Sequence, residues 1–325
     1  MNGAALVQLA LNALSCTQKE LAVRLGVSPT QISKWKSGEH MSKDMDDKLR
    51  KMSGIGDKDP QFVVWAGSLD AADKWEKVIR LLADAAQEEA ETGYVTEPLT
   101  DDMGLLPWHT FHVLRKMGVE LPKEFPKEVE GAIGLNEEDD SASDLDSRWE
   151  AMMENPYTSL IYKIYKSLND VYGFYAAYVE GLVYDESLDI FEIGSQVDSC
   201  LLELAAAKLD EKPVMAANYD AFKWNTLQDY EKWLNTVKEK AFRAGVPLRA
   251  ELLDLAYGSA GELGSEAEAE SLGLNKGRLH PDIYMNELLV GMRTIHQVLP
   301  AILKKLGISE EFKLDASEFR VNSRR

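Results

Sequence analysis

Apolar residues recur at spacings of three and four along most of the chain, a pattern typical of amphipathic helices. In the first 52 residues this spacing predicts four short helices. The first carries an apolar face made by Leu6, Leu9 and Ala13, the second runs over residues 18–25, and the third begins at residue 29. The fourth is marked by an apolar stripe between residues 45 and 52.

Residues that favour helix ends separate these segments. Thr17 stands before the second helix with Glu20 three residues later, which is the pattern of a capping box. Gly26 follows that helix, where a left-handed backbone would end it. Ser28 and Pro29 suit the N-cap and first position of the third helix. The pattern therefore predicts two helices joined by a tight turn.

The segment from Thr17 to Gly38 reads TQKELAVRLGVSPTQISKWKSG and closely resembles the helix-turn-helix of the Cro/C1 repressor family. The matching positions are the opening Thr-Gln-x-Glu-Leu-Ala, with its small Ala22, followed by Gly26, Val27, Ile32, Trp35 and Gly38. The resemblance covers residues 4–52. It implies a small domain, residues 1–56, that binds double-stranded DNA.

In such a domain the third helix enters the major groove. We therefore expect its outward residues to meet base edges: Gln31 with adenine, Lys34 with guanine, and the Thr30 methyl with thymine. Related domains often place a polar base-reading residue where this chain has Pro29, so direct readout is expected to be thinner here. By resemblance, Gln18 should bind a backbone phosphate.

Three further phosphate-contact candidates are Ser28, Lys36 and Lys43. For the two lysines, an ordinary solvated role stays open.

Charge is divided unevenly along the chain. Residues 1–56 hold eight basic and five acidic side chains, whereas the other 269 residues hold 28 basic and 50 acidic ones, a net charge of −22. Phosphate attraction is thus confined to the N-terminal domain. One domain with a net charge of +3 binds DNA weakly, so we expect a homodimer that reads half-sites about 34 Å apart.

The remainder predicts an all-α chain, in which a small helix-turn-helix domain is followed by a larger helical domain. We expect a linker with a short apolar segment at 57–68, an acidic helical domain for oligomerisation or effector binding at 69–307, and a tail at 308–325. Residues 130–146 hold seven acids and no base, which predicts a flexible loop. No helical repeat of fixed period is present.

Several helices are expected within the larger domain. Apolar stripes predict helices ending near residue 93 and at residues 105–117, then a long one at 160–179. Tyrosines surround the long helix, which indicates either a central packed helix or a ligand pocket or dimer interface. Helices at 188–210, 220–244 and 247–258 precede an acidic, Gly/Ala-rich loop at 259–277. The last helix runs over 281–306 and is bent at Pro300.

Signals for chemistry are weak. His109 and His112 lie three residues apart near Asp101 and Asp102, but two histidines do not make a zinc site and no third ligand is evident. Phosphate-binding glycine loops and nucleophile elbows are absent from the sequence. We expect no metal, no cofactor and no enzymatic activity. Membrane-spanning and signal segments are also missing, which predicts a cytoplasmic protein.

These features favour a homodimeric, sequence-specific transcriptional regulator, with repression favoured over activation on the family resemblance. Its helical body would dimerise and could sense a small-molecule effector or a protein partner. An alternative is an interaction protein, such as an antitoxin or defence-system component, whose acidic body binds a basic partner while the head autoregulates. A third is an enzyme with a DNA-targeting head.

Overall fold

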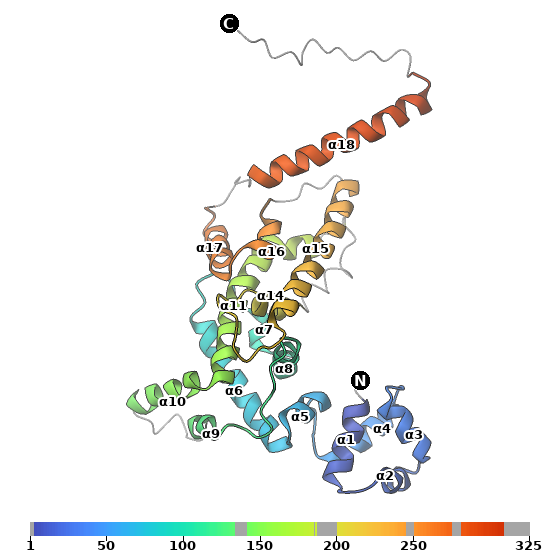
Figure 1. The fold of residues 1–325 in the computed structure, drawn as a ribbon, viewed down its shortest axis with the longest axis vertical. Coiled ribbons are helices and arrows are strands. Elements are labelled where there is room, and N and C mark those ends of the chain that lie inside the picture. The colour runs from blue at the N-terminus through green and yellow to red at the C-terminus, as the bar shows by residue number, and fades with distance from the viewer. Residues whose placement is uncertain are drawn as a thin grey trace. The chain divides into compact units, whose positions relative to one another are not determined.

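The computed structural model describes residues 3–133, 142–184, 186, 200–244, 250–274 and 281–308. These residues form helices and no strand, which confirms the all-α prediction (Figure 1). An isolated antiparallel bridge joins Val119 to Ala216. The chain divides into one unit of residues 1–248 with 252–276 and a second of residues 249–251 with 277–325.

Four helices form the N-terminal domain: α1 (Gly3–Ala13), α2 (Gln18–Leu25), α3 (Pro29–Lys36) and α4 (Lys43–Ser53). The first packs against the other three. Their shared core is made of side chains with almost no solvent exposure, among them Leu6, Val7, Ala10, Leu21, Ala22, Ile32 and Leu49.

The expected linker at residues 57–68 is wrong as a description of this segment, because it contains helix α5 (Pro60–Ala66). Asp59 caps this helix by accepting hydrogen bonds from the N–H groups of Gln61 and Phe62, at 2.8 and 2.9 Å. Phe62 is buried and its ring meets that of Phe111 edge-on at 5.0 Å. The helix packs against α1 on one side and against the body on the other.

The body is built around α11 (Pro156–Tyr178), the green helix at the centre of Figure 1. It packs against α6 (Leu69–Glu88), α14 (Leu201–Ala207) and α17 (Ala260–Ser271). The other helices of this unit are α7 (Glu97–Thr100), α8 (Leu106–Lys116), α9 (Lys127–Ile133), α10 (Ala142–Glu154), α12 (Glu180–Val183), α15 (Tyr219–Ala244) and α16 (Asp254–Tyr257). The 3-10 helix η1 (Ala250–Leu253) spans the division between the two units.

The tyrosines of α11 belong to the core, as the prediction of a central packed helix requires. Tyr162, Tyr165, Tyr172, Tyr175 and Tyr178 are each at most 9% exposed. They are therefore not available for an interface between chains. At Gly173, an added Cβ would lie 2.6 Å from the Cβ of Thr92, so only glycine permits this close approach.

Residues 260–271 were expected to be part of a loop and instead form α17. Ser259 and Glu262 form a capping box that begins the helix. Its small residues bring its backbone close to α11, because Leu263, Gly264 and Ala267 face inward and are buried. Helix α17 therefore forms although it has few large apolar side chains. Its small residues let the two helices pack closely, and the additional van der Waals contacts stabilise it.

Parts of other predictions fall outside the described residues. The ends of the expected acidic loop at 130–146 belong to α9 and α10, and residues 134–141 lie outside. The expected helix at 188–210 is represented by α14 alone, since residues 187–199 lie outside. Residues 250–257 form η1 and α16 where a helix was expected. Of the tail at 308–325, only Ile308 is described.

The last helix, α18 (Pro281–Leu306), has the predicted bounds and contains Pro300. It belongs to the second unit of the chain, so the expected single body at 69–307 is divided. None of the described helices has the length and apolar character needed to cross a membrane.

Candidate nucleic-acid interface

The turn between α2 and α3 has the predicted geometry. Thr17 and Glu20 form a complete capping box at the start of α2. Gly26 ends α2 with φ of 71°, in the left-handed region that favours glycine. Ser28 caps α3 by accepting a hydrogen bond from the Gln31 N–H at 3.2 Å. These local interactions fix the direction in which α3 leaves the turn.

One face of α3 is buried against the rest of the domain and the other is exposed to solvent. Ile32 and Trp35 are at most 4% exposed, and this face packs against α1. The residues predicted to read bases lie elsewhere on the helix: Thr30 and Lys34 are exposed and Gln31 is half-buried. The structure therefore leaves the polar side of α3 accessible to a groove of DNA.

Lys34 already has a partner in the free protein. Its Nζ lies 3.3 Å from a carboxylate oxygen of Glu39, and both side chains are about half exposed. An exposed pair of this kind contributes about 0–1 kcal/mol. A contact between Lys34 and a guanine must therefore replace a weak ion pair, which is a small cost.

The side chain of Gln18 takes a role that sequence reasoning missed. Its Nε2 donates to the Pro29 carbonyl oxygen at 3.0 Å and to Ser33 Oγ at 2.6 Å. Both amide hydrogens therefore tie the start of α2 to α3. The sequence predicts that this amide binds a backbone phosphate. To do so, Gln18 would have to break one of these two hydrogen bonds. The polar residues Gln18 and Ser33 were visible in the sequence, but nothing in it signals their contact.

The other phosphate candidates lie on the surface of the domain. The Ser28 oxygen accepts the capping bond, so its hydroxyl hydrogen remains able to donate. Lys36 is the last residue of α3 and Lys43 the first of α4; both are exposed. Neither forms an ion pair with any residue that the structure describes.

The two histidines considered as metal ligands contribute to an aromatic cluster between α5 and α8. The His112 ring stacks on Trp108 with centroids 4.8 Å apart, and the His109 ring meets Trp108 edge-on at 4.9 Å. Burial lowers the pKa of both imidazoles. A carboxylate oxygen of Asp101 accepts the Leu106 N–H at 2.8 Å, so this acid caps α8. Among the described residues, no three potential ligands converge.

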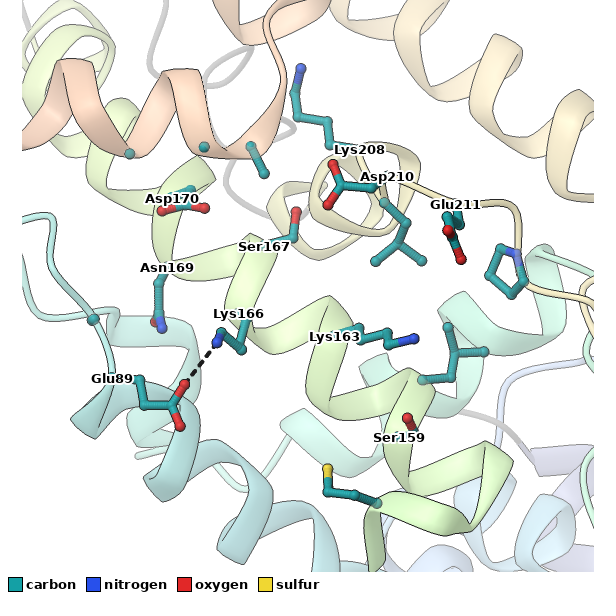
Figure 2. Close-up of a pocket in the computed structure, with 18 of the residues that line it drawn as sticks. Glu89, Ser159, Lys163, Lys166, Ser167, Asn169, Asp170, Lys208, Asp210 and Glu211 are labelled. Atoms are coloured by element: carbon teal, nitrogen blue, oxygen red, sulfur yellow. Dashed lines mark ion pairs between the residues drawn. The ribbon is translucent and has the colours of Figure 1, made fainter.

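A second candidate site is an open groove of about 1350 Å³ along one side of α11 (Figure 2). Three of its four lysines are occupied. Lys166 pairs with Glu89 at 2.8 Å, Lys212 pairs with Asp220, and Lys208 donates to the carbonyl oxygens of Ala256 and Gly258. Burial lowers the pKa of Lys208 to about 8.

Carboxylates outnumber lysines in this groove. Its lining acids other than Glu89 are Glu91, Glu154, Asp170, Asp210, Glu211 and Glu268. Figure 2 shows Lys163 extending into the same space as Asp210 and Glu211. Burial raises the pKa of Asp170 to about 6. The groove is therefore an acidic, solvent-open surface with a single lysine, Lys163, that no described residue engages.

Comparison with known proteins identifies the N-terminal domain alone. The family model described as Helix-turn-helix matches residues 7–45. No match was found among curated proteins or among solved structures. Residues 7–45 therefore form a helix-turn-helix domain of the Cro/C1 type, a DNA-binding family, at the N-terminus of a helical body.

Proposed function

We propose that this protein is a sequence-specific transcriptional regulator that binds an operator as a homodimer and represses by occupying it. The observation that carries the proposal is the accessible polar side of α3, whose N-terminus is fixed by the Ser28 cap and whose opposite side is buried. Cro/C1-type domains use this helix to enter the major groove. No catalytic step is part of the proposal.

In the proposed complex, the two classes of contact have separate roles. Gln31 pairs with an adenine edge by donating through its amide N–H and accepting through its oxygen, Lys34 donates to a guanine edge, and Thr30 meets a thymine methyl. These residues set the sequence preference. Ser28, Lys36 and Lys43 bind phosphates and set register and salt dependence. Backbone N–H groups at the start of α2 can add a phosphate contact there without breaking the bonds of Gln18.

The test is a selection of bound duplexes from a random pool with the full-length chain at two salt concentrations. We expect an enriched motif with two half-sites about one helical turn apart. Enrichment that disappears with rising salt and never yields a motif would contradict sequence-specific binding, because phosphate contacts alone carry no sequence information.

A second candidate is the interaction protein, whose body binds a basic partner or effector. The excess of carboxylates in the groove along α11 favours it. We expect an oligolysine peptide to bind the full-length chain in calorimetry and Asp210→Asn with Glu211→Gln to weaken it. The matched control is Glu97→Gln with Asp102→Asn, which removes two exposed acids outside the groove. Equal weakening in both variants would mean that only net charge matters.

A further inference from the structure

The apolar surface of the described residues is concentrated on α18. Twenty large apolar side chains are exposed in the described parts of the chain, and nine of them lie between residues 288 and 308. The other eleven are spread from Val23 to Leu274. A contiguous apolar patch marks an interaction site, whereas scattered apolar residues do not, so what matters is which of these residues share one face of the helix.

The spacing on α18 is that of a helix that pairs with another helix. Six apolar positions alternate in steps of four and three: Leu288, Met292, Ile295, Leu299, Ile302 and Leu306. The exposed Leu289, Val290 and Val298 lie outside this series. This alternation repeats every seven residues, and a period of 3.5 keeps the stripe facing a partner helix. We call these six residues the α18 stripe.

The opposite side of α18 is mainly polar, with Val290 as an exposed apolar residue among polar ones. At 100° per residue, Arg293, Thr294 and Gln297 fall on the side away from the stripe. Pro300 also projects away from the stripe, so the bend that it introduces leaves the apolar residues in line.

The size of the stripe fits a modest interface. Residues 288–306 of the helix are about 28 Å long and 10–12 Å across, so half of the lateral surface is about 500 Å². Two copies would bury about 1,000 Å², which is the lower bound for a specific interface. The expected association is therefore weak and dependent on concentration.

We propose that the α18 stripe is the dimer interface of this protein and that its occupant is α18 of a second copy, related by a two-fold axis. This inference rests on the proposed function, which requires two DNA-binding domains in one assembly. Five of the six tyrosines of α11, the other candidate interface in the sequence, are buried within their own chain, and Tyr157 is half-buried. A two-fold axis also brings the same stripe from both copies together, as a symmetric dimer requires.

The test is sedimentation equilibrium of the full-length chain from low micromolar to about 100 µM. The stripe variant is Met292→Glu with Ile295→Glu, and the matched control is Thr294→Glu with Gln297→Glu on the polar side. We expect the wild type and the control to dimerise and the stripe variant to dimerise about 100-fold or more weakly, because each dimer would bury four carboxylates. Far-UV circular dichroism checks that the helices of the body remain.

A wild-type chain that stays monomeric overturns the proposal, because α18 would then cover its own chain or another partner. A stripe variant that dimerises as well as the control also overturns it. Binding to duplexes with one or two half-sites separates this inference from the proposed function. If the regulator reading holds, the stripe variant keeps its affinity for one half-site and loses the gain from the second. A dimer that depends on the stripe but prefers no DNA sequence supports the interface and refutes the regulator.

Discussion

Substitution of Gly264 by alanine tests the packing of α17 on α11, the contact that the sequence did not predict. A Cβ at this position would lie 2.1 Å from Oδ1 of Asp170 and 2.8 Å from its Cγ. Alanine is favoured over glycine by about 1 kcal/mol in a helix interior, but overpacking costs about 1–3 kcal/mol. The two effects together predict that Gly264→Ala lowers the free energy of unfolding by up to about 2 kcal/mol.

The matched control lies one turn earlier on the same helix. A Cβ at Gly261 would meet nothing within 4 Å, so Gly261→Ala should be neutral or stabilise by up to about 1 kcal/mol. Urea unfolding followed by circular dichroism compares the two variants. In an Asp170→Ala background the obstacle is gone, and Gly264→Ala should then behave like the control.

Two results would refute this reasoning. If Gly264→Ala and Gly261→Ala were equally stable, α17 would not lie against Asp170. If the cost of Gly264→Ala persisted without the Asp170 carboxylate, the destabilisation would have another cause, such as the helix backbone itself.

Three further predictions concern the DNA-binding domain and the groove. Gln31→Ala and Lys34→Ala should each cost about 1–3 kcal/mol on a selected duplex and much less on random DNA, measured by fluorescence anisotropy; equal losses on both would exclude base readout. Thr17→Ala removes the N-cap of α2 and should lower the free energy of unfolding by about 1 kcal/mol, whereas Thr17→Ser should retain most of it in the same urea titration. Burial raises the pKa of Asp170 from 3.8 to about 6, so the folded state binds this proton more tightly and the contribution of Asp170 to stability falls as pH rises from about 4 to 6. Asp170→Asn should therefore stabilise the protein at pH 7 by about 1–2 kcal/mol after allowance for solvent screening. If the free energy of unfolding of the wild type and of Asp170→Asn depended on pH in the same way, the raised pKa of Asp170 would be contradicted.

The helix-turn-helix could be predicted because each of its signals has a local steric cause. The Thr17 cap, Gly26 and Pro29 act within one turn of helix, and the structure has all three in their predicted places. The central helix α11 and the last helix α18 were predictable for a related reason, since their apolar periodicity persists over about twenty residues.

The elements that sequence reasoning missed depend on distant partners. Helix α5 is seven residues long, too short for periodicity to show. It is stabilised by contact of the buried Phe62 with Phe111 of α8 and by packing of the helix against α1. Helix α17 is rich in glycine, alanine and glutamate, and its burial depends on the close approach of Gly264 to Asp170. Its capping box at Ser259 was a usable signal. For Gln18, no sequence feature indicates that its amide would donate a hydrogen bond to Ser33.

The position of α5 bears on how an acidic chain can bind DNA. Helix α1 packs against both α3 and α5, and Figure 1 shows α3 and α5 on opposite sides of α1. The part of the body that packs against α5 is thus attached on the side of the domain away from α3, while most of the acidic excess of the chain lies outside this domain.

Ionic strength determines whether the acidic body repels DNA that is bound at α3. Electrostatic repulsion is screened over about 8 Å at physiological salt but reaches about 30 Å at 0.01 M. Phosphate contacts alone would make log K rise steadily as salt falls, by about 0.9 per neutralised phosphate. Repulsion from the body should therefore flatten this rise at low salt, where its field reaches the duplex. A plot of log K against log salt that stays straight down to 0.01 M would show that the body lies too far from the DNA to matter.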